Sequence, residues 1–331
     1  MEPIVITGDA RLERLNDEEL FAAGESAFAA HDYRAAARYF DRLVDFHPDS
    51  KHLRAATYNA GLAHEKTGDW EDALGRFSLL ADPARGTGDA LDAAFQQAEA
   101  LYHLGRYVEA ITILTELGAR ADLTEGERLQ AQVQRGVCEV EDGRLEGAEA
   151  TFRRALTDYQ AISDRGLVDD FYPAQAQFFL GEIYRLRYQM VSLDPNQRAD
   201  ELAKDLEYKA ELLLSAQGHY LRAIRMGNRY WSTASGERIG SLYESLYEHL
   251  VSSPAPTELD EEEAQVYRQE LRKKIRVLIT KAINVYERTL EAAERVGAAS
   301  PFVERTRESL RKMKELLIAD AQNDDGPQTP N

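Results

Sequence analysis

The sequence has very little cysteine and no long apolar segment. Its only cysteine is Cys138, so an internal disulfide and a cysteine-rich zinc site are both excluded. No stretch reaches the roughly 20 apolar residues that a membrane-spanning helix needs. The first nine residues lack a basic start and an apolar run, so the chain as written shows no secretory leader. We expect no membrane insertion and a cytoplasmic protein as written, with the cell envelope or periplasm as the alternative if a leader peptide is missing from this sequence.

Basic residues are also fewer than acidic residues. The chain has 40 lysines and arginines against 58 aspartates and glutamates, which gives a formal net charge of -18. A polyanion is on average repelled by such a protein, so the composition argues against nucleic acid as a partner. The hydrophobic fraction of 44% is too high for a disordered chain. We therefore expect an acidic protein of which most folds around a substantial core.

Catalytic motifs are absent as well. The seven histidines are scattered, and none forms a His-Glu-x-x-His pair. The sequence contains no Gly-x-Ser-x-Gly elbow and no glycine-rich phosphate loop. An enzyme would need a site assembled from residues distant in the sequence, so we expect no catalytic site, no metal site and no cofactor. Alternating runs of β-branched residues bounded by turns are missing too, which favours an all-α protein.

A short phrase recurs along the first half of the chain: a turn residue, an aromatic residue or leucine, two further residues, and alanine. Successive copies lie 37, 37 and 38 residues apart. The aromatic or leucine positions are Tyr33, Trp70, Tyr107 and Leu145. Nine residues before them stand Gly24, Gly61, Ala98 and Gly136, and seven residues after them stand Phe40, Phe77, Leu114 and Phe152. A small residue at the first of these places lets two helices of a hairpin approach closely.

The intervals between Gly24, Ala36, Phe40 and Pro48 resemble those of the tetratricopeptide repeat (TPR), a helical hairpin of 34 residues. Three or four extra residues in each linker account for the longer period here. The resemblance covers about residues 17 to 160. It implies an all-α, TPR-type αα solenoid, a right-handed superhelix of helical hairpins. The sequence departs from the family in lacking its tryptophan four residues before the small residue, and in lacking the closing proline outside the first copy.

The second half continues the pattern with longer helices. Gly181 precedes Tyr184 by three residues, and Gly240 precedes Tyr243 by the same interval. Helical patterns run from Glu201 to Arg225, from Glu261 to Val296 and from Pro301 to Ile318. We predict an N-terminal extension (1–15), four TPR hairpins (16–165), two enlarged hairpins with a C-terminal capping helix (166–318) and a disordered tail (319–331).

This second half also faintly resembles TPR proteins associated with the gliding-motility machinery of myxobacteria and their relatives. The resemblance rests on Phe178 to Arg185, on Arg238-Ile239-Gly240 and on Pro301 to Glu308, and it covers at most residues 170 to 318. It implies a bacterial, envelope-associated scaffold. A self-assembling structural component is a further alternative, because repeat arrays stack or dimerise through their end helices, so a homo-oligomer stays open.

In the TPR family, the first helix of each hairpin lines the concave face. The residues three before, one after and four after the small residue point into that face. The predicted partner-binding groove is made up of Phe21, Phe28, Tyr58, Glu65, Phe95, Glu99, Tyr102, Phe178 and Glu182. One interpretation is that the aromatic stripe packs between neighbouring helices. The other is that it anchors a protein or peptide partner that presents apolar and basic side chains.

Overall fold

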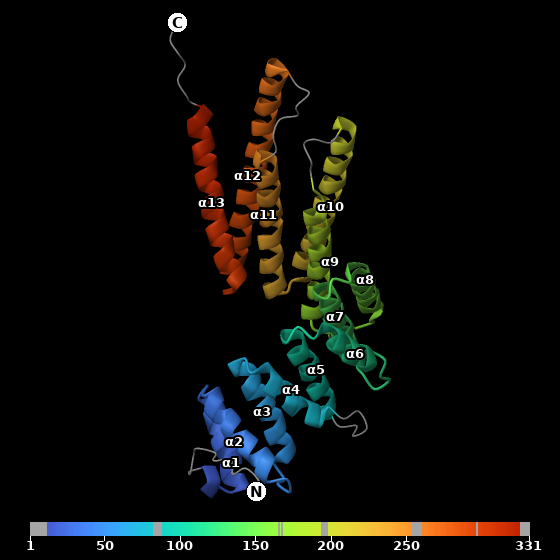
Figure 1. Cartoon of the computed structure of the whole chain (residues 1–331), viewed down its shortest axis with the longest axis vertical. Helices are drawn as coiled ribbons and strands as arrows, with labels where there is room; N and C mark the ends of the chain where they lie inside the picture. Colours follow the sequence, from blue (N-terminus) through green and yellow to red (C-terminus); the bar gives the residue numbers. More distant parts are fainter. Residues whose placement is uncertain are drawn as a thin grey trace, which may run out of the picture. The chain divides into compact units, whose positions relative to one another are not determined.

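The computed structural model describes residues 12–81, 88–164, 166, 168–192, 198–252, 260–295 and 297–324. Within these ranges the secondary structure is helical, without strands (Figure 1). The chain divides into two compact units, unit 1 from Met1 to Arg144 and unit 2 from Leu145 to Asn331. The predictions for residues 1–11, for parts of the two inserts near Pro195 and Pro254, and for residues 325–331 lie outside the described ranges.

Unit 1 is a row of helical hairpins. Each helix packs against the next along the chain. The elements are η1 (Leu12–Arg14), α1 (Asp17–Ala29), α2 (Tyr33–Phe46), α3 (Leu53–Thr67), α4 (Trp70–Leu80), α5 (Gly88–His103), α6 (Tyr107–Gly118) and α7 (Glu125–Glu141). Capping boxes begin α1 and α7, where Asn16 and Thr124 each exchange hydrogen bonds with a glutamate three residues later. These caps satisfy amide groups that have no partner within their own helix.

The turn inside each hairpin needs one residue with a left-handed backbone. Gly68, Gly105 and Gly143 occupy this place with φ of 81°, 72° and 79°. His31 takes the same place in the first hairpin with φ of 61°. The recurring glycine of the phrase is therefore explained by backbone conformation, because glycine adopts positive φ without steric cost.

In the first two hairpins the small residue lies under a phenylalanine ring of the second helix. A Cβ atom on Gly24 would lie 2.5 Å from a ring carbon of Phe40, and one on Gly61 would lie 2.5 Å from a ring carbon of Phe77. Both phenylalanines are buried. The absence of a side chain at these glycines lets the two backbones approach, as the spacing predicts.

Unit 2 contains longer helices in the same arrangement. Its elements are α8 (Leu145–Ala161), α9 (Phe171–Met190), α10 (Ala199–Met226), α11 (Arg229–Ser252), α12 (Glu261–Arg295) and α13 (Pro301–Asp324). The pairs α9/α10 and α11/α12 are the two enlarged hairpins, and α13 packs against α11 and α12. The last helix continues to Asp324, beyond the expected end at Ile318. The boundary between the two units lies between α7 and α8 in the sequence, whereas the predicted domain boundary follows α8.

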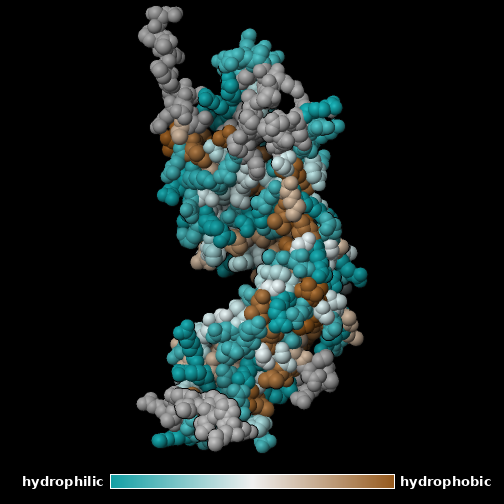
Figure 2. Space-filling view, in the orientation of Figure 1, coloured by the Kyte–Doolittle hydropathy of each residue, from teal (hydrophilic) through white to brown (hydrophobic). Residues whose placement is uncertain are grey.

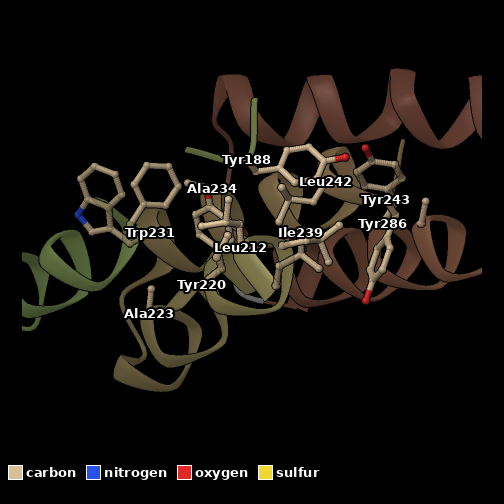
Figure 3. Packing of buried hydrophobic residues seen from close by; sticks show 14 of the residues in the cluster. Tyr188, Leu212, Tyr220, Ala223, Trp231, Ala234, Ile239, Leu242, Tyr243 and Tyr286 are labelled. Carbon is tan, nitrogen blue, oxygen red and sulfur yellow. The ribbon is translucent and has the colours of Figure 1, made fainter. Parts of the chain in front are cut away.

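The core of unit 2 repeats the glycine-on-ring contact with tyrosine in place of phenylalanine. A Cβ atom on Gly181 would lie 2.5 Å from a ring carbon of Tyr220, and Gly240 approaches Tyr286 in the same way. Both tyrosines are fully buried among the apolar side chains of the cluster drawn in Figure 3. A buried hydroxyl needs a hydrogen-bond partner. The Tyr220 hydroxyl donates to Glu182 at 2.5 Å, and the Tyr286 hydroxyl donates to Glu244 at 3.1 Å.

Candidate partner-binding surface

The predicted groove residues of unit 1 lie on the first helices of its hairpins. Phe21 and Phe28 are on α1, Tyr58 and Glu65 are on α3, and the other three are on α5. All of them except Phe95 keep part of their side chain accessible. Phe95 is 7% exposed and belongs to the core beneath α5 and α6. The first-helix positions named by the repeat therefore form a surface that is partly accessible to solvent.

The aromatic rings of this surface also contact their own unit. Phe21 packs on Phe40 with ring centroids 5.8 Å apart and stacks on the His52 ring at 4.3 Å. Tyr58 meets Phe77 edge to face at 5.7 Å. One side of each ring thus supports the fold, while part of the ring stays accessible. The two interpretations of the aromatic stripe are compatible in this geometry.

Carboxylates of α5 and α7 lie near the Tyr102 ring. Burial raises the pKa of the Tyr102 hydroxyl, and the charges of Glu141 and Glu99 raise it further. Burial likewise raises the pKa of the Cys138 thiol to about 12, helped by Glu99 and two acidic residues of α7. The acidic neighbours add to the effect of burial in both cases, because a negative neighbour disfavours a further anion. A cation approaching Tyr102 would be attracted.

The two predicted carboxylates have close local partners. Glu65 accepts a hydrogen bond from Lys66 at 2.9 Å, and its side chain is 18% exposed. Glu99 lies 3.3 Å from His103, one turn further along α5, and its side chain is 42% exposed. Glu99 is therefore the more accessible of the two to a partner.

The two predicted residues of unit 2 are buried. Phe178 is 4% exposed, and its ring lies 4.9 Å from that of Trp231. Glu182 is 8% exposed and accepts hydrogen bonds from Tyr220, from Arg185 at 2.8 Å and from Arg238 at 2.9 Å. Burial acts to raise the pKa of Glu182, but the Arg185 hydrogen bond and the two arginine charges outweigh it and leave that pKa lowered. In this structure both side chains serve the core of unit 2.

Two cavities in unit 2 involve residues that the repeat pattern does not single out. One, of about 590 Å³, lies among α8, α9 and α10 and is polar. The other, of about 470 Å³, lies among α10, α11 and α12 and is mostly apolar. Each cavity is lined by three consecutive helices, and apart from Tyr184 the lining residues belong to no recurring phrase, so the repeat pattern does not bring them together.

On the face seen in Figure 2, hydrophilic residues cover much of the coloured surface, with hydrophobic residues in patches. No helix in the described part of the chain is both long and apolar enough to cross a bilayer. Across the same residues, no group of three or more histidine, cysteine or acidic side chains is placed to hold a metal ion.

Comparison with known proteins agrees with the repeat. The family model described as "Tetratricopeptide repeat" matches residues 21–86 and 58–123. No curated protein matches the chain. Among solved structures, the chain is similar to RapI in its apo form, with 10% identity over 93% of this chain and 100% of that chain and a TM-score of 0.48. It is also similar to NprR in complex with its cognate peptide NprX, with 14% identity over 97% and 86% of the two chains and a TM-score of 0.45.

A third similar structure is a tetratricopeptide repeat protein from Parabacteroides merdae ATCC 43184, with 16% identity over 90% of this chain and 98% of that chain and a TM-score of 0.41. The hairpins, their glycine-on-ring contacts and the partly exposed first-helix face define an all-α repeat solenoid, a class that provides surfaces for protein binding. The chain carries tetratricopeptide repeats, matched over residues 21–123, as its sequence predicts.

Proposed function

We propose that this protein is a non-catalytic scaffold that binds a segment of a partner protein along the first-helix face of unit 1. The observation that carries the proposal is the partly exposed series of aromatic rings on α1, α3 and α5 with carboxylates beside them. Tyr58 and Tyr102 are the central anchors, because aromatic side chains in desolvated contacts dominate binding energies. Their rings are held in place by Phe77 and Tyr107, which reduces the ordering cost of binding.

The partner segment presents apolar side chains to the rings and at least one basic side chain near Tyr102. Glu99 and Glu141 supply the negative potential at that place. A lysine or arginine there gains a charge-assisted hydrogen bond with Glu99, whose side chain remains 42% exposed. Binding of this kind weakens as salt is added, because exposed charges are screened.

The test is affinity capture from native lysate followed by mass spectrometry, with a Glu65→Lys/Glu99→Lys variant and a matched control. The control, Glu71→Lys/Glu116→Lys, makes the same change in charge on the second helices α4 and α6, where both residues are exposed. Circular dichroism first establishes that both variants are helical. We expect partners that the wild type and the control capture and that the first variant loses. Equal capture by all three proteins would reject the first-helix face as the binding surface.

Assembly of several copies of the chain is the second candidate function. It is favoured by large apolar side chains exposed on α10, where Leu214 is 63%, Tyr208 51% and Leu221 39% exposed. Exposed apolar side chains such as these are removed from water when a second copy of the chain covers them. Light scattering over a concentration series decides this point, since a constant monomer mass rejects self-assembly as the main role. An envelope-associated scaffold remains compatible with either function.

A further inference from the structure

The polar cavity of unit 2 lies among the two second helices α8 and α10 and the first helix α9. Its polar lining includes Arg153 and Gln160 from α8, Gln177 and Tyr184 from α9, and His219 and Arg222 from α10. The cavity measures about 590 Å³, which is the size of a site for a small molecule or a few side chains. It is distinct from the first-helix face of unit 1, so binding in this cavity is independent of the function proposed for that face.

Two of these polar side chains are buried and hold each other in place. Gln177 and His219 are each 7% exposed, and the Nδ1 atom of His219 lies 3.0 Å from the Oε1 atom of Gln177. The Tyr184 ring stacks on the His219 ring with centroids 5.4 Å apart. Gln177 Oε1 also accepts a hydrogen bond from the Nε atom of Arg222 at 3.3 Å. Since this oxygen is occupied, the NH2 group of Gln177 is the part of the amide left to donate to a ligand.

The cavity carries uncompensated positive charge. Among its lining residues in the described part of the chain, none is acidic. The nearby Glu149 accepts hydrogen bonds from Arg153 at 2.8 Å, from Arg187 at 2.7 Å and from Tyr184 at 2.9 Å. Burial opposes the ionisation of Glu149, but these three bonds outweigh it and lower its pKa to about 2. Glu149 is therefore already neutralised by its own partners.

Arg153 is paired with Glu149, so Arg222 is the lining cation that has no acidic hydrogen-bond partner among the described residues. Its one hydrogen bond among the described residues goes to the neutral amide of Gln177. Burial of part of the side chain lowers the pKa of Arg222, and so do the positive charges of Arg153 and Arg225. Burial and the charge of Arg222 lower the pKa of His219 to about 4, so the imidazole is neutral at pH 7. This concentration of positive charge occurs in a chain whose formal net charge is -18.

We propose that the cavity among α8, α9 and α10 binds an oxyanion, either the phosphate or the carboxylate group of a ligand. Arg222 holds the anion with the terminal nitrogens of its guanidinium, whose planar fork matches two oxygen atoms. The Gln177 amide donates a further hydrogen bond from the buried side. His219 fixes the orientation of that amide and lies against the site, where its ring senses whether an anion is bound.

The experiment uses the full chain and two probes, inorganic phosphate and acetate, each titrated at constant ionic strength with chloride as the balancing ion. Binding is followed at pH 7 by NMR through the ring resonances of His219, identified by their loss in His219→Gln. We expect a saturable shift of these resonances and smaller or no shifts for the other histidines. The probe that binds more tightly identifies the source of the oxyanion as phosphate or carboxylate.

Two variants with the same change in charge distinguish binding at the proposed site from non-specific attraction of anions to the protein. Arg222→Gln removes the proposed ligand, and we expect its dissociation constant to rise about tenfold or more, as for the loss of a hydrogen bond to a charged group. Arg225→Gln removes a neighbouring charge of the same helix outside the lining, so its dissociation constant should change by less than about threefold through long-range charge alone. Arg222→Lys, which keeps the charge and loses the fork, should bind with intermediate affinity.

Three results would overturn the proposal. The first is the absence of a saturable His219 shift with either probe. The second is an equal loss of affinity in Arg222→Gln and Arg225→Gln, which would mean that the anion responds only to overall charge. The third is undiminished binding by Arg222→Gln in a sample whose circular dichroism matches the wild type.

Discussion

At the scale of single residues, the clearest constraint is the backbone conformation of the hairpin turns. Gly68 ends α3 with φ of 81°, and a Cβ atom there would have no neighbour within 4 Å. Any effect of adding a side chain at this place therefore comes from the backbone. Gly75 offers the matched control, because it lies inside α4 and its Cβ atom would also have no neighbour within 4 Å.

We predict opposite effects on stability for alanine at these two glycines. Gly68→Ala should lower the free energy of unfolding by about 1 kcal/mol, the cost of a left-handed backbone for a residue with a Cβ atom. Gly75→Ala should raise it by about 0.8 kcal/mol, because alanine is the better helix former. Urea denaturation of the two variants and the wild type measures both values. A Gly68→Ala variant as stable as the wild type would show that the turn can adopt another conformation.

His64 ties three helices of unit 1 together through acidic partners. Its Nε2 atom lies 2.9 Å from Asp41 of α2, and Asp41 also accepts a hydrogen bond at 2.9 Å from Arg76 of α4. Burial acts to lower the pKa of His64, but the hydrogen bond and the charge of Asp41 outweigh it and leave that pKa raised. A raised pKa in the folded state means that the charged imidazole contributes stability below the unfolded pKa of 6.5, and that this contribution is lost as the pH rises through the folded value.

His64→Gln should therefore destabilise the protein more at pH 6 than at pH 9. At pH 6 we expect a loss of about 1.5 kcal/mol, as for a hydrogen bond to a charged group. At pH 9 the loss should be smaller, because the wild-type imidazole has itself become neutral. Denaturation curves at the two pH values test the sign. The same loss at both would mean that His64 contributes by packing alone.

At the scale of elements, four hairpins contain a contact between a glycine of the first helix and a ring of the second, made by Gly24, Gly61, Gly181 and Gly240. In the first enlarged hairpin the ring is also held at its hydroxyl, which donates a hydrogen bond to the buried Glu182. We predict that Gly181→Ala lowers the free energy of unfolding by about 2 to 3 kcal/mol through overpacking. Gly218→Ala is the control in the neighbouring helix, where the nearest side-chain atom would be 3.6 Å from the new Cβ.

The control should be neutral or slightly stabilising, because alanine favours the helix and meets only the flexible end of Arg222. Thermal unfolding followed by circular dichroism compares the two variants. If Gly181→Ala were no less stable than Gly218→Ala, α9 and α10 would be able to separate without loss, and the glycine would not set their distance.

The elements themselves follow from the sequence because their causes are local. The left-handed turns, the caps and the pairing of Gly24 with Phe40 all act within one hairpin, where a fixed interval links the residues. In the enlarged hairpins the interval changes, so Gly181 could be recognised while its partner Tyr220 could not. The same reason explains the surface residues. Helical spacing places Phe95 and Tyr102 on one face, but their different burial depends on the neighbouring hairpin.

The buried state of Glu182 could not be predicted, because its donors Tyr220 and Arg238 stand 38 and 56 residues further along the chain. Only tertiary packing brings them together. The pairing of Gln177 with His219 is hidden in the same way, since the two residues lie 42 positions apart and belong to no repeated phrase. Sequence patterns thus reveal which helices form, whereas polar clusters formed between helices require the structure.

At the scale of the whole molecule, the excess of acidic residues affects both stability and binding. The formal net charge of -18 at pH 7 produces self-repulsion in the folded state, which is relieved by screening. Many of the ion pairs join exposed side chains, such as Lys51 with Glu18, and such pairs contribute little to stability. Screening should therefore remove more repulsion than attraction.

We predict that salt acts in opposite directions on folding and on partner binding. Raising potassium chloride from about 10 mM to about 150 mM at pH 7 shortens the Debye length from about 30 Å to about 8 Å, so the melting temperature should rise. The same addition should weaken capture of a basic partner by the first-helix face, because Glu99 is then screened. Near the sequence isoelectric point of about 4.9 the salt dependence of melting should vanish or reverse, since the net charge is small. Calorimetry at the two pH values measures the first effect, and capture at the two salt concentrations measures the second.

A melting temperature that falls with salt at pH 7 would mean that specific ion pairs, such as those of Glu149 and Glu182, outweigh the net charge. Capture that is unaffected by salt would mean that the partner is held by the aromatic rings alone.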